Sequence, residues 1–346
     1  MRFDPLDSLF PAPASGSAPA TPLRQRRPVD PAPPQNQLNY RAFPSWARLE
    51  QKAREEGPAV FFAAGAGLAL LDGVLCQEPP FAGALRQRLA LKATAASAKI
   101  LRLREDEAAL RDGEHLAAVE NPGPAGRLHR LWRGLAGQDA RLDAMRFDEA
   151  LRLLDLPEPG DLGALVGALR ELMKAPDDPV TLAARAATRL HRLCPRPEGE
   201  IFAAWTADLL LAMRLGWERP TPLLATKILD PSLRRGPASV RPRPSDLDWP
   251  QAVAAAYALA ASDAHALALE LSRRTEKLLA AAPKLRAKRA SRVVELLLAE
   301  DCLAPSRAAK FSGLSDRAAR RLFDRLVELD GVREVSGRTA FRLYGL

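Results

Sequence analysis

Apolar residues recur every three to four positions along most of the chain, which is the period of helices with one buried face. The pattern begins near residue 44, and its segments end at proline or glycine, as helices do. No stretch before residue 330 alternates apolar and polar positions as a strand would. Helices are predicted over 45–57, 58–75, 80–103, 126–137, 146–154, 160–174, 179–193 and 198–215. Residues 105–116 are expected to extend the third of these, and residues 44–217 to form one all-helical domain.

Proline and alanine dominate two segments that lack this period. Residues 1–43 are predicted to be a disordered tail. Residues 218–249 carry many prolines and are predicted to be a linker, although "PTPLLATKIL" within them could dock on the helical domain. A long Ala/Leu helix is predicted over 250–282, with Pro250 in its first turn, where a proline fits.

The C-terminal residues 283–346 have the pattern of a winged helix-turn-helix. "ASRVVELLLAE" and "APSRAAKF" predict two helices, and "DRAARRLFDRLVEL" predicts a third. Between the last two, Gly313 can adopt the left-handed conformation of a tight turn, and Ser315 can cap the next helix. "VREVS" and "TAFRLYGL" predict a hairpin. The fold class is therefore mainly α: an all-helical N-terminal domain plus a C-terminal winged helix-turn-helix with a small β-hairpin.

The third helix of this module carries two stripes with a four-residue step. Leu314, Ala318, Leu322 and Leu326 are expected to face inward. Arg317, Arg321 and Arg325 form the second stripe, with Arg320 beside them. This arginine stripe lies about 100° away around the helix and is expected to be exposed.

Positive charge is concentrated in the same module. The chain has a net charge of +9, and residues 284–346 hold 14 Lys/Arg against 8 Asp/Glu. Such a patch suits double-stranded DNA, with the third helix in the major groove and other cations on phosphates. The candidate DNA-binding residues are Arg317, Arg320, Arg321, Arg325, Arg338, Arg307, Lys288 and Arg289. The alternative is a module that contacts protein, because Asp316, Asp324, Glu328 and Asp330 can pair with the arginines.

A second alternative is an enzyme in the helical domain. Its candidate groups are Asp72, in an apolar helix, and the acidic cluster at 105–115 with Asp112 and His115. Adjacent acids on a helix point in different directions, so an ion-paired surface helix also explains the cluster. Asp72 is expected to pair with an arginine between 86 and 104. No cofactor motif or metal-ligand spacing is present, and we assign no catalytic, cofactor-binding or metal residue.

Three cysteines, Cys76, Cys194 and Cys302, lie far apart without a CxxC motif, and we expect reduced thiols in a cytoplasmic protein. The N-terminus mixes acids and prolines and does not resemble a signal peptide. The most apolar stretch, 60–75, is shorter than a membrane span and contains Asp72, so a buried helix without membrane contact is expected.

Several blocks resemble an uncharacterised family, the domain of unknown function numbered 1403, which occurs mainly in alphaproteobacteria and often on plasmids. The resemblance rests on "GPAVFFAAGAGLALLD", "RQRLALKATAASAKI", "LDWPQAVAAAYALAA", "AAAPKLRAKRASRVVELLLAED" and the closing "GLSDRAARRLFDRLVEL". The closing block also resembles the winged helix that ends many Fic-domain proteins, although the Fic catalytic motif is absent. The resemblance implies no established activity. We predict a DNA-binding protein, a transcriptional regulator or plasmid-maintenance factor, whose helical domain contacts a second copy, a ligand or a protein partner.

Overall fold

Helices carry almost all of the regular structure in the computed structural model, which describes residues 40–50, 57–116, 122–158, 160–236, 238–285, 289–336 and 342–346. Within these residues it contains thirteen α-helices and one pair of short antiparallel strands, which confirms the mainly-α prediction. The helices before the C-terminal module are α1 (Gly57–Leu75), α2 (Ala82–Ile100), α3 (Glu107–Leu116), α4 (Pro124–Gly137), α5 (Ala144–Leu153), α6 (Leu162–Met173), α7 (Pro179–Leu193), α8 (Pro197–Leu215), α9 (Leu224–Lys227) and α10 (Trp249–Ala281).

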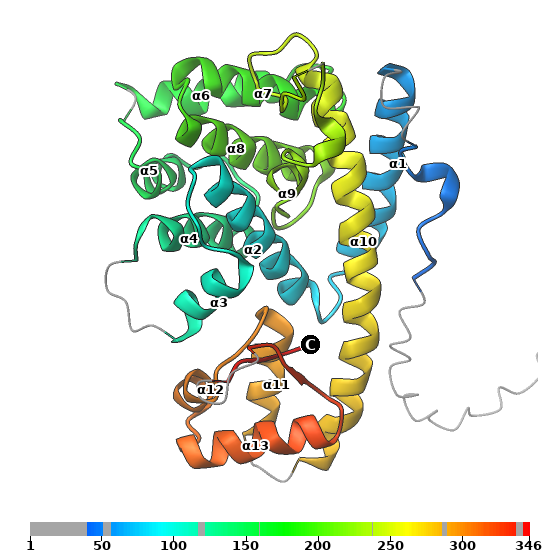
Figure 1. Ribbon diagram of the computed structural model, residues 1–346, viewed down its shortest axis with the longest axis vertical. Coiled ribbons are helices and arrows are strands. Elements are labelled where there is room, and N and C mark those ends of the chain that lie inside the picture. The colour runs from blue at the N-terminus through cyan, green and yellow to red at the C-terminus, as the bar shows by residue number, and fades with distance from the viewer. Residues whose placement is uncertain are drawn as a thin grey trace, which may run out of the picture. The chain divides into compact units, whose positions relative to one another are not determined.

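The longest helix, α10, organises the fold, and α1 lies along its first half (Figure 1). Every residue from Ala252 to Ala258 is buried, so this part of α10 is surrounded by other helices. Further along, only one face is buried. Both α1 and α10 are long and apolar enough to cross a membrane by length and composition. Their apolar composition is also explained by burial within the protein, because the two helices pack against each other and against α7.

Aspartates at helix starts fix several of the shorter helices. Asp143, Asp161 and Asp178 each accept a hydrogen bond from a backbone N–H in the first turn of α5, α6 and α7. This cap satisfies donors that have no partner inside the helix. The following helix, α8, is buried along most of its length and packs on α7.

Part of the proline-rich segment 218–249 lies inside the core. Thr221, Leu223, Leu224 and Ala225 are buried, and α9 starts among them. The expectation that "PTPLLATKIL" docks on the helical domain is therefore confirmed. Pro220 and Pro222 favour an extended path at its start, and the buried side chains supply the apolar contact that holds it there.

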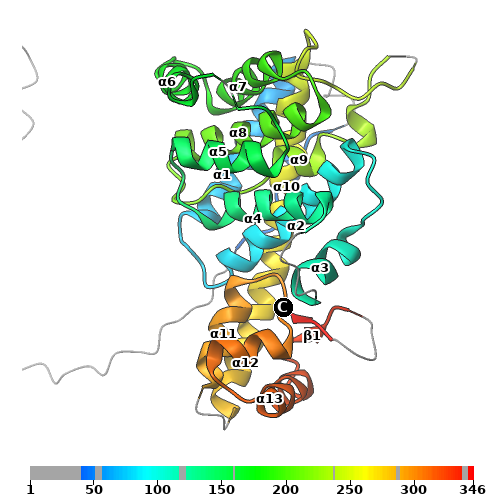
Figure 2. The same cartoon turned by 90° about the vertical axis from the view of Figure 1, so that its left-hand side faces the viewer.

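The C-terminal module contains three helices and two strands. They are α11 (Ala290–Ala299), α12 (Pro305–Ser312), α13 (Asp316–Glu328), β1 (Arg333–Glu334) and β2 (Tyr344–Gly345). The strands are antiparallel, with Arg333 opposite Gly345 and Glu334 opposite Tyr344. Both views place α11–α13 at one end of α10, with α13 far from α6–α8 (Figures 1 and 2).

Two helix predictions are wrong in extent. The helix expected over 45–57 is a single 3-10 turn at Ser45–Ala47, after which Arg48 is extended; residues 51–56 lie outside the described residues. The acidic segment does not extend α2, because the chain leaves the helix after Ile100 and α3 begins at Glu107. Arg102, with a φ of 58°, stands at that break.

Candidate nucleic-acid interface

The turn between α12 and α13 has the geometry that the sequence predicts. Gly313 ends α12 with a φ of 69°, in the left-handed region that favours glycine. Ser315 then caps α13, because its Oγ accepts a hydrogen bond from the N–H of Ala318 at 3.3 Å. Arg289, from the start of α11, donates from Nη1 to the carbonyl oxygen of Gly313 at 2.6 Å. The turn is thereby fixed relative to the first helix of the module.

One apolar stripe anchors α13 to the rest of the module. Ala319, Leu322, Phe323 and Leu326 are buried, and Phe323 stacks on Tyr344 of β2 with 4.8 Å between ring centroids. The inward stripe is therefore shifted by one position at its start from the predicted one. Leu314 and Ala318 are only half-buried, because Ala319 and Phe323 take the central positions.

The opposite face of α13 is exposed and charged. Arg317, Arg320 and Arg321 lie in its first two turns, and no described residue forms an ion pair with them. Arg325, in the last turn, pairs with Glu328 at 2.8 Å. Positive charge on this helix is thus concentrated toward its N-terminal half.

The other predicted DNA-binding residues do not all join this face. Arg289 is engaged at the turn, and Arg307 of α12 contacts Glu300 at 3.4 Å and Glu114 at 3.8 Å. Lys288 and Arg338 lie outside the described residues. The structure therefore brings together Arg317, Arg320, Arg321 and Arg325, and directs Arg289 and Arg307 toward contacts within the chain.

A third extended segment joins the two strands. Leu303, between α11 and α12, exchanges two backbone hydrogen bonds with Tyr344, at 2.8 and 3.1 Å. The order across this small sheet is β1, β2 and then Leu303. Two arginines in or near these strands are paired: Arg333 of β1 with Glu270 at 2.9 Å, and Arg342, just before β2, with Glu334 at 3.5 Å.

Buried ion pairs seat this module on the preceding helices. Asp301 is 5% exposed and accepts from Arg88 and Arg111, both at 2.8 Å. Burial raises the pKa of Asp301, but the Arg111 and Arg88 guanidiniums more than offset this and hold it below its usual value. Glu300 pairs with Arg133 at 2.7 Å. No pattern in the sequence predicts these ion pairs; the adjacent acids that follow the apolar helix α11 are the only local signal.

The acidic cluster of α3 lies beside this contact. Asp106 caps α3 through the N–H of Ala109 at 2.8 Å, and Glu114 pairs with Arg133 and Arg307. Burial, together with the nearby Arg133 guanidinium, lowers the pKa of His115 and of His129 to about 3, so both imidazoles are neutral at neutral pH. No group of three His, Cys, Asp or Glu side chains that could hold a metal occurs among the described residues.

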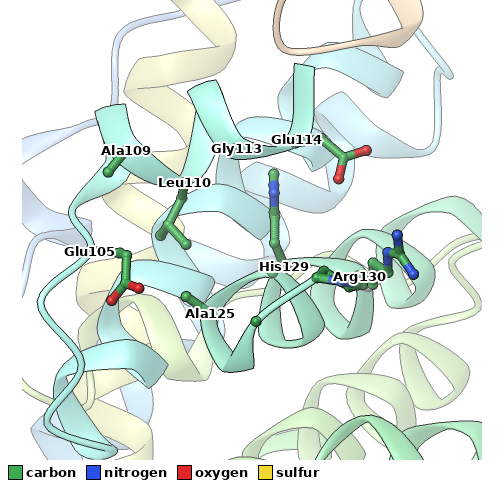
Figure 3. A pocket seen from close by; sticks show the side chains of 11 residues that line it. Glu105, Ala109, Leu110, Gly113, Glu114, Ala125, His129 and Arg130 are labelled. Atoms are coloured by element: carbon green, nitrogen blue, oxygen red, sulfur yellow. The ribbon is translucent and has the colours of Figure 1, made fainter. Parts of the chain in front are cut away.

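A cavity of about 290 Å³ lies between α3 and α4 (Figure 3). Leu110 and Ala125 form its apolar part, Glu105 lies on one side, and Glu114 and His129 lie on the other. These groups can hydrogen-bond a small molecule. Among the described residues that line it, no cysteine, serine, threonine or lysine side chain occurs.

Asp72 has a different partner from the expected one. Its Oδ1 accepts from the indole Nε1 of Trp217 at 2.7 Å and from the Cys76 thiol at 3.2 Å. An arginine from 86–104 is not among these partners: Arg86 pairs with Glu78 at 2.6 Å, and Arg88 with Asp301. Asp72 thus links the end of α1 to Trp217, which follows Gly216 at the C-terminal end of α8.

Comparison with curated proteins finds no significant match. A family match covers nearly the whole chain and includes both the helical part and the C-terminal module. Since residues 34–346 match it, the chain belongs to the family described as "Protein of unknown function (DUF1403)".

Proposed function

We propose that this chain is a DNA-binding protein whose residues 283–346 act as a winged helix. Three helices followed by a strand pair, with a third extended segment at Leu303 beside β2, support this assignment. In such modules the last helix enters the major groove, while other basic residues contact phosphates.

The observation that carries the proposal is the exposed cluster of Arg317, Arg320 and Arg321 on α13. Arginines near a helix N-terminus are unfavourable, because the helix dipole is positive there. Asp316 is the one acid in that first turn. Arg317 lies in that first turn, and Arg320 and Arg321 place two more positive charges in the next one, all three without a described ion-pair partner. Like charges so close together oppose local stability, and such conflicts concentrate at functional sites. A phosphate backbone would supply the missing negative charge.

The test is fluorescence anisotropy of the full chain with a random DNA duplex over a series of salt concentrations. Each phosphate contact should contribute a slope of about −0.9 to the plot of log K against log salt. The Arg317→Ala/Arg320→Ala/Arg321→Ala variant should weaken binding and make this slope shallower by about two to three. A matched variant, Arg141→Ala/Arg152→Ala/Arg192→Ala, removes the same charge from exposed positions outside the C-terminal module and should bind like the wild type.

Equal losses in both triple variants would mean that only net charge matters, and the absence of duplex binding by a folded chain would refute the proposal. The second result would favour a protein partner. That alternative has its own support in the mixed charge around Asp324 and Glu328, and in the exposed side chains of Phe311 and Val327. The enzyme alternative gains no support from the described contacts, which place Asp72 and Glu114 in structural hydrogen bonds and ion pairs.

Within this proposal the protein acts in the cytoplasm, where its free thiols Cys76, Cys194 and Cys302 remain reduced. Control of transcription and maintenance of a plasmid both require the same contact with duplex DNA. A selection of bound sequences from a random pool would distinguish a protein that prefers one site from one that binds any duplex.

A further inference from the structure

The cavity between α3 and α4 contains a buried polar group that lacks a partner. His129 of α4 is 3% exposed, and no described residue forms a hydrogen bond with its Nδ1. Its ring is directed from α4 toward Gly113 and Glu114 of α3 (Figure 3). A buried polar atom without a hydrogen bond is unfavourable, and a ligand in the cavity would supply the missing partner.

Two carboxylates lie on opposite sides of the same cavity (Figure 3). Glu105 is exposed and has no hydrogen bond or ion pair with any described residue. Glu114 contacts Arg133 at 3.6 Å and Arg307 at 3.8 Å, and both distances are longer than a hydrogen bond. Both carboxylates therefore keep oxygens that can accept hydrogen bonds from a ligand.

The charges on the Glu114 side balance one another. Arg133 and Arg307 each contact both Glu114 and Glu300, so two cations face two carboxylates. Burial, together with the nearby Arg133 guanidinium, lowers the pKa of His129 to about 3, so the imidazole adds no charge at neutral pH. This side of the cavity thus offers hydrogen-bonding atoms without net charge.

The Glu105 side differs, because its carboxylate has no cationic partner among the described residues. Arg130 also lines the cavity, but it is engaged in an interaction of its own. A ligand that fits this arrangement carries a positive charge at the Glu105 side and a hydrogen-bond donor at the other. A charged donor on a carboxylate forms one of the stronger hydrogen bonds in proteins.

Apolar side chains lie between the two sides. Leu110 and Ala125 are buried and form the middle of the cavity, whereas Ala109 and Gly113 are exposed at its edge and leave it open to solvent. The volume of about 290 Å³ is at the small end of the range for ligand sites. The ligand is therefore small and has an apolar body.

We propose that this cavity binds a small aliphatic amine that carries a hydrogen-bond donor at each end. The ammonium group pairs with Glu105, the methylene groups pack on Leu110 and Ala125, and the second donor, an amino or hydroxyl group, reaches Glu114 and His129. One ring nitrogen of a neutral imidazole is an acceptor, so Nδ1 can take this hydrogen bond. The inference does not depend on the proposed DNA binding.

Saturation-transfer NMR of aminobutanol in the presence of the full chain tests the site, and a titration gives the Kd. Butylamine lacks the second donor and butanediol lacks the charge, so both should bind more weakly than aminobutanol. Glu105→Gln should weaken the binding of aminobutanol about two- to fivefold, as expected for an exposed ion pair. Glu107→Gln removes the same charge from a position that does not line this cavity and should bind like the wild type.

Two further variants test the cavity itself. His129→Phe keeps an aromatic ring and removes a nitrogen that has no partner in the described chain, so the variant should fold but bind about tenfold more weakly. Gly113→Leu adds a side chain where a Cβ would meet no atom within 4 Å, and it should block the cavity. Gly65→Leu, at a similarly open position of α1, is its matched control and should bind like the wild type. Far-UV circular dichroism should be the same for all variants.

Four results would overturn the proposal. They are no saturation transfer to aminobutanol with the folded wild type, equal affinities for butanediol and aminobutanol, equal losses in Glu105→Gln and Glu107→Gln, and unchanged binding in both His129→Phe and Gly113→Leu. The second and third would show that the Glu105 charge is not recognised. The fourth would show that the amine binds outside this cavity.

Discussion

At the scale of single residues, Asp208 is the most deeply buried carboxyl group of the helical part. It lies on α8 with no exposed surface. Its oxygens accept from the backbone N–H groups of Leu223 and Leu224, at 2.9 and 3.1 Å, and from the Tyr257 hydroxyl at 3.1 Å. One side chain thus joins α8, the start of α9 and α10. Burial raises the pKa of Asp208 to about 7, although these hydrogen bonds act in the opposite direction.

This carboxyl group should make stability depend on pH. Its pKa in the folded protein lies above the unfolded value of 3.8, so the folded state retains a proton that the unfolded state has lost. The stability from this proton is fully present below pH 3.8 and is lost as pH rises toward 7, with a slope of up to about 1.4 kcal/mol per pH unit. Urea unfolding of wild type and Asp208→Asn between these pH values should show this slope in the difference between the two proteins. A difference that does not change with pH would contradict the shift.

At the scale of elements, the turn between α12 and α13 joins two local signals. Gly313 permits the left-handed turn, and Ser315 caps α13. Both residue types favour these positions in most proteins. This is why the sequence alone predicts both helix ends here. Arg289, which lies 24 positions away in the sequence, holds the turn from outside.

Substitutions at this turn should destabilise the C-terminal module. Gly313→Ala forces alanine into the left-handed region, which costs about 1–2 kcal/mol, and its Cβ would collide with Arg289. Ser315→Ala removes only the cap and should cost about 1 kcal/mol. Hydrogen exchange of the α12 and α13 amides, measured by mass spectrometry, should become faster in both variants and more so in the first. Unchanged protection in Gly313→Ala would mean that the turn is not strained.

At the scale of the whole molecule, the C-terminal module is joined to the helical part through charges rather than through an apolar surface alone. Asp301 lies between Arg88 of α2 and Arg111 of α3, and Glu300 contacts Arg133 of α4. These pairs bring together residues that are up to 213 positions apart. A buried ion pair of this kind adds little to the stability of the fold compared with apolar packing. Removing one partner is nevertheless costly, because the other charge is left buried without a counter-charge.

Removing Asp301 should therefore be costly. Asp301→Ala leaves two buried guanidiniums without a counter-charge and should lower the free energy of unfolding by about 3–5 kcal/mol. Asp330→Ala is the matched control: that carboxylate also pairs with two cations, Lys277 and Arg274, but it is 64% exposed. Its denaturation midpoint should stay close to that of the wild type. Equal shifts in the two midpoints would show that burial of the Asp301 pairs contributes nothing.

The helices, the turn at Gly313 and the closing strand pair follow from the sequence alone. Each depends on apolar period, caps and turn residues that lie within a few positions of one another. The arginine face of α13 follows too, because a helix fixes which residues share a side. The break after Ile100, the short turn at Ser45 and the short helix α9 do not follow from these rules, since chain direction there depends on what the segments pack against.

Contacts between distant segments were decided only by the tertiary structure. Sequence alone could not show that Arg307 faces Glu114 instead of solvent, that Asp72 meets Trp217, or that Leu303 pairs with Tyr344. In each case the partners lie more than 40 positions apart, and several side chains of the right chemistry compete for each role. Local pattern specifies which element forms and which face is apolar. The packing of those faces then selects among the possible partners, because burial penalises every polar group left without one.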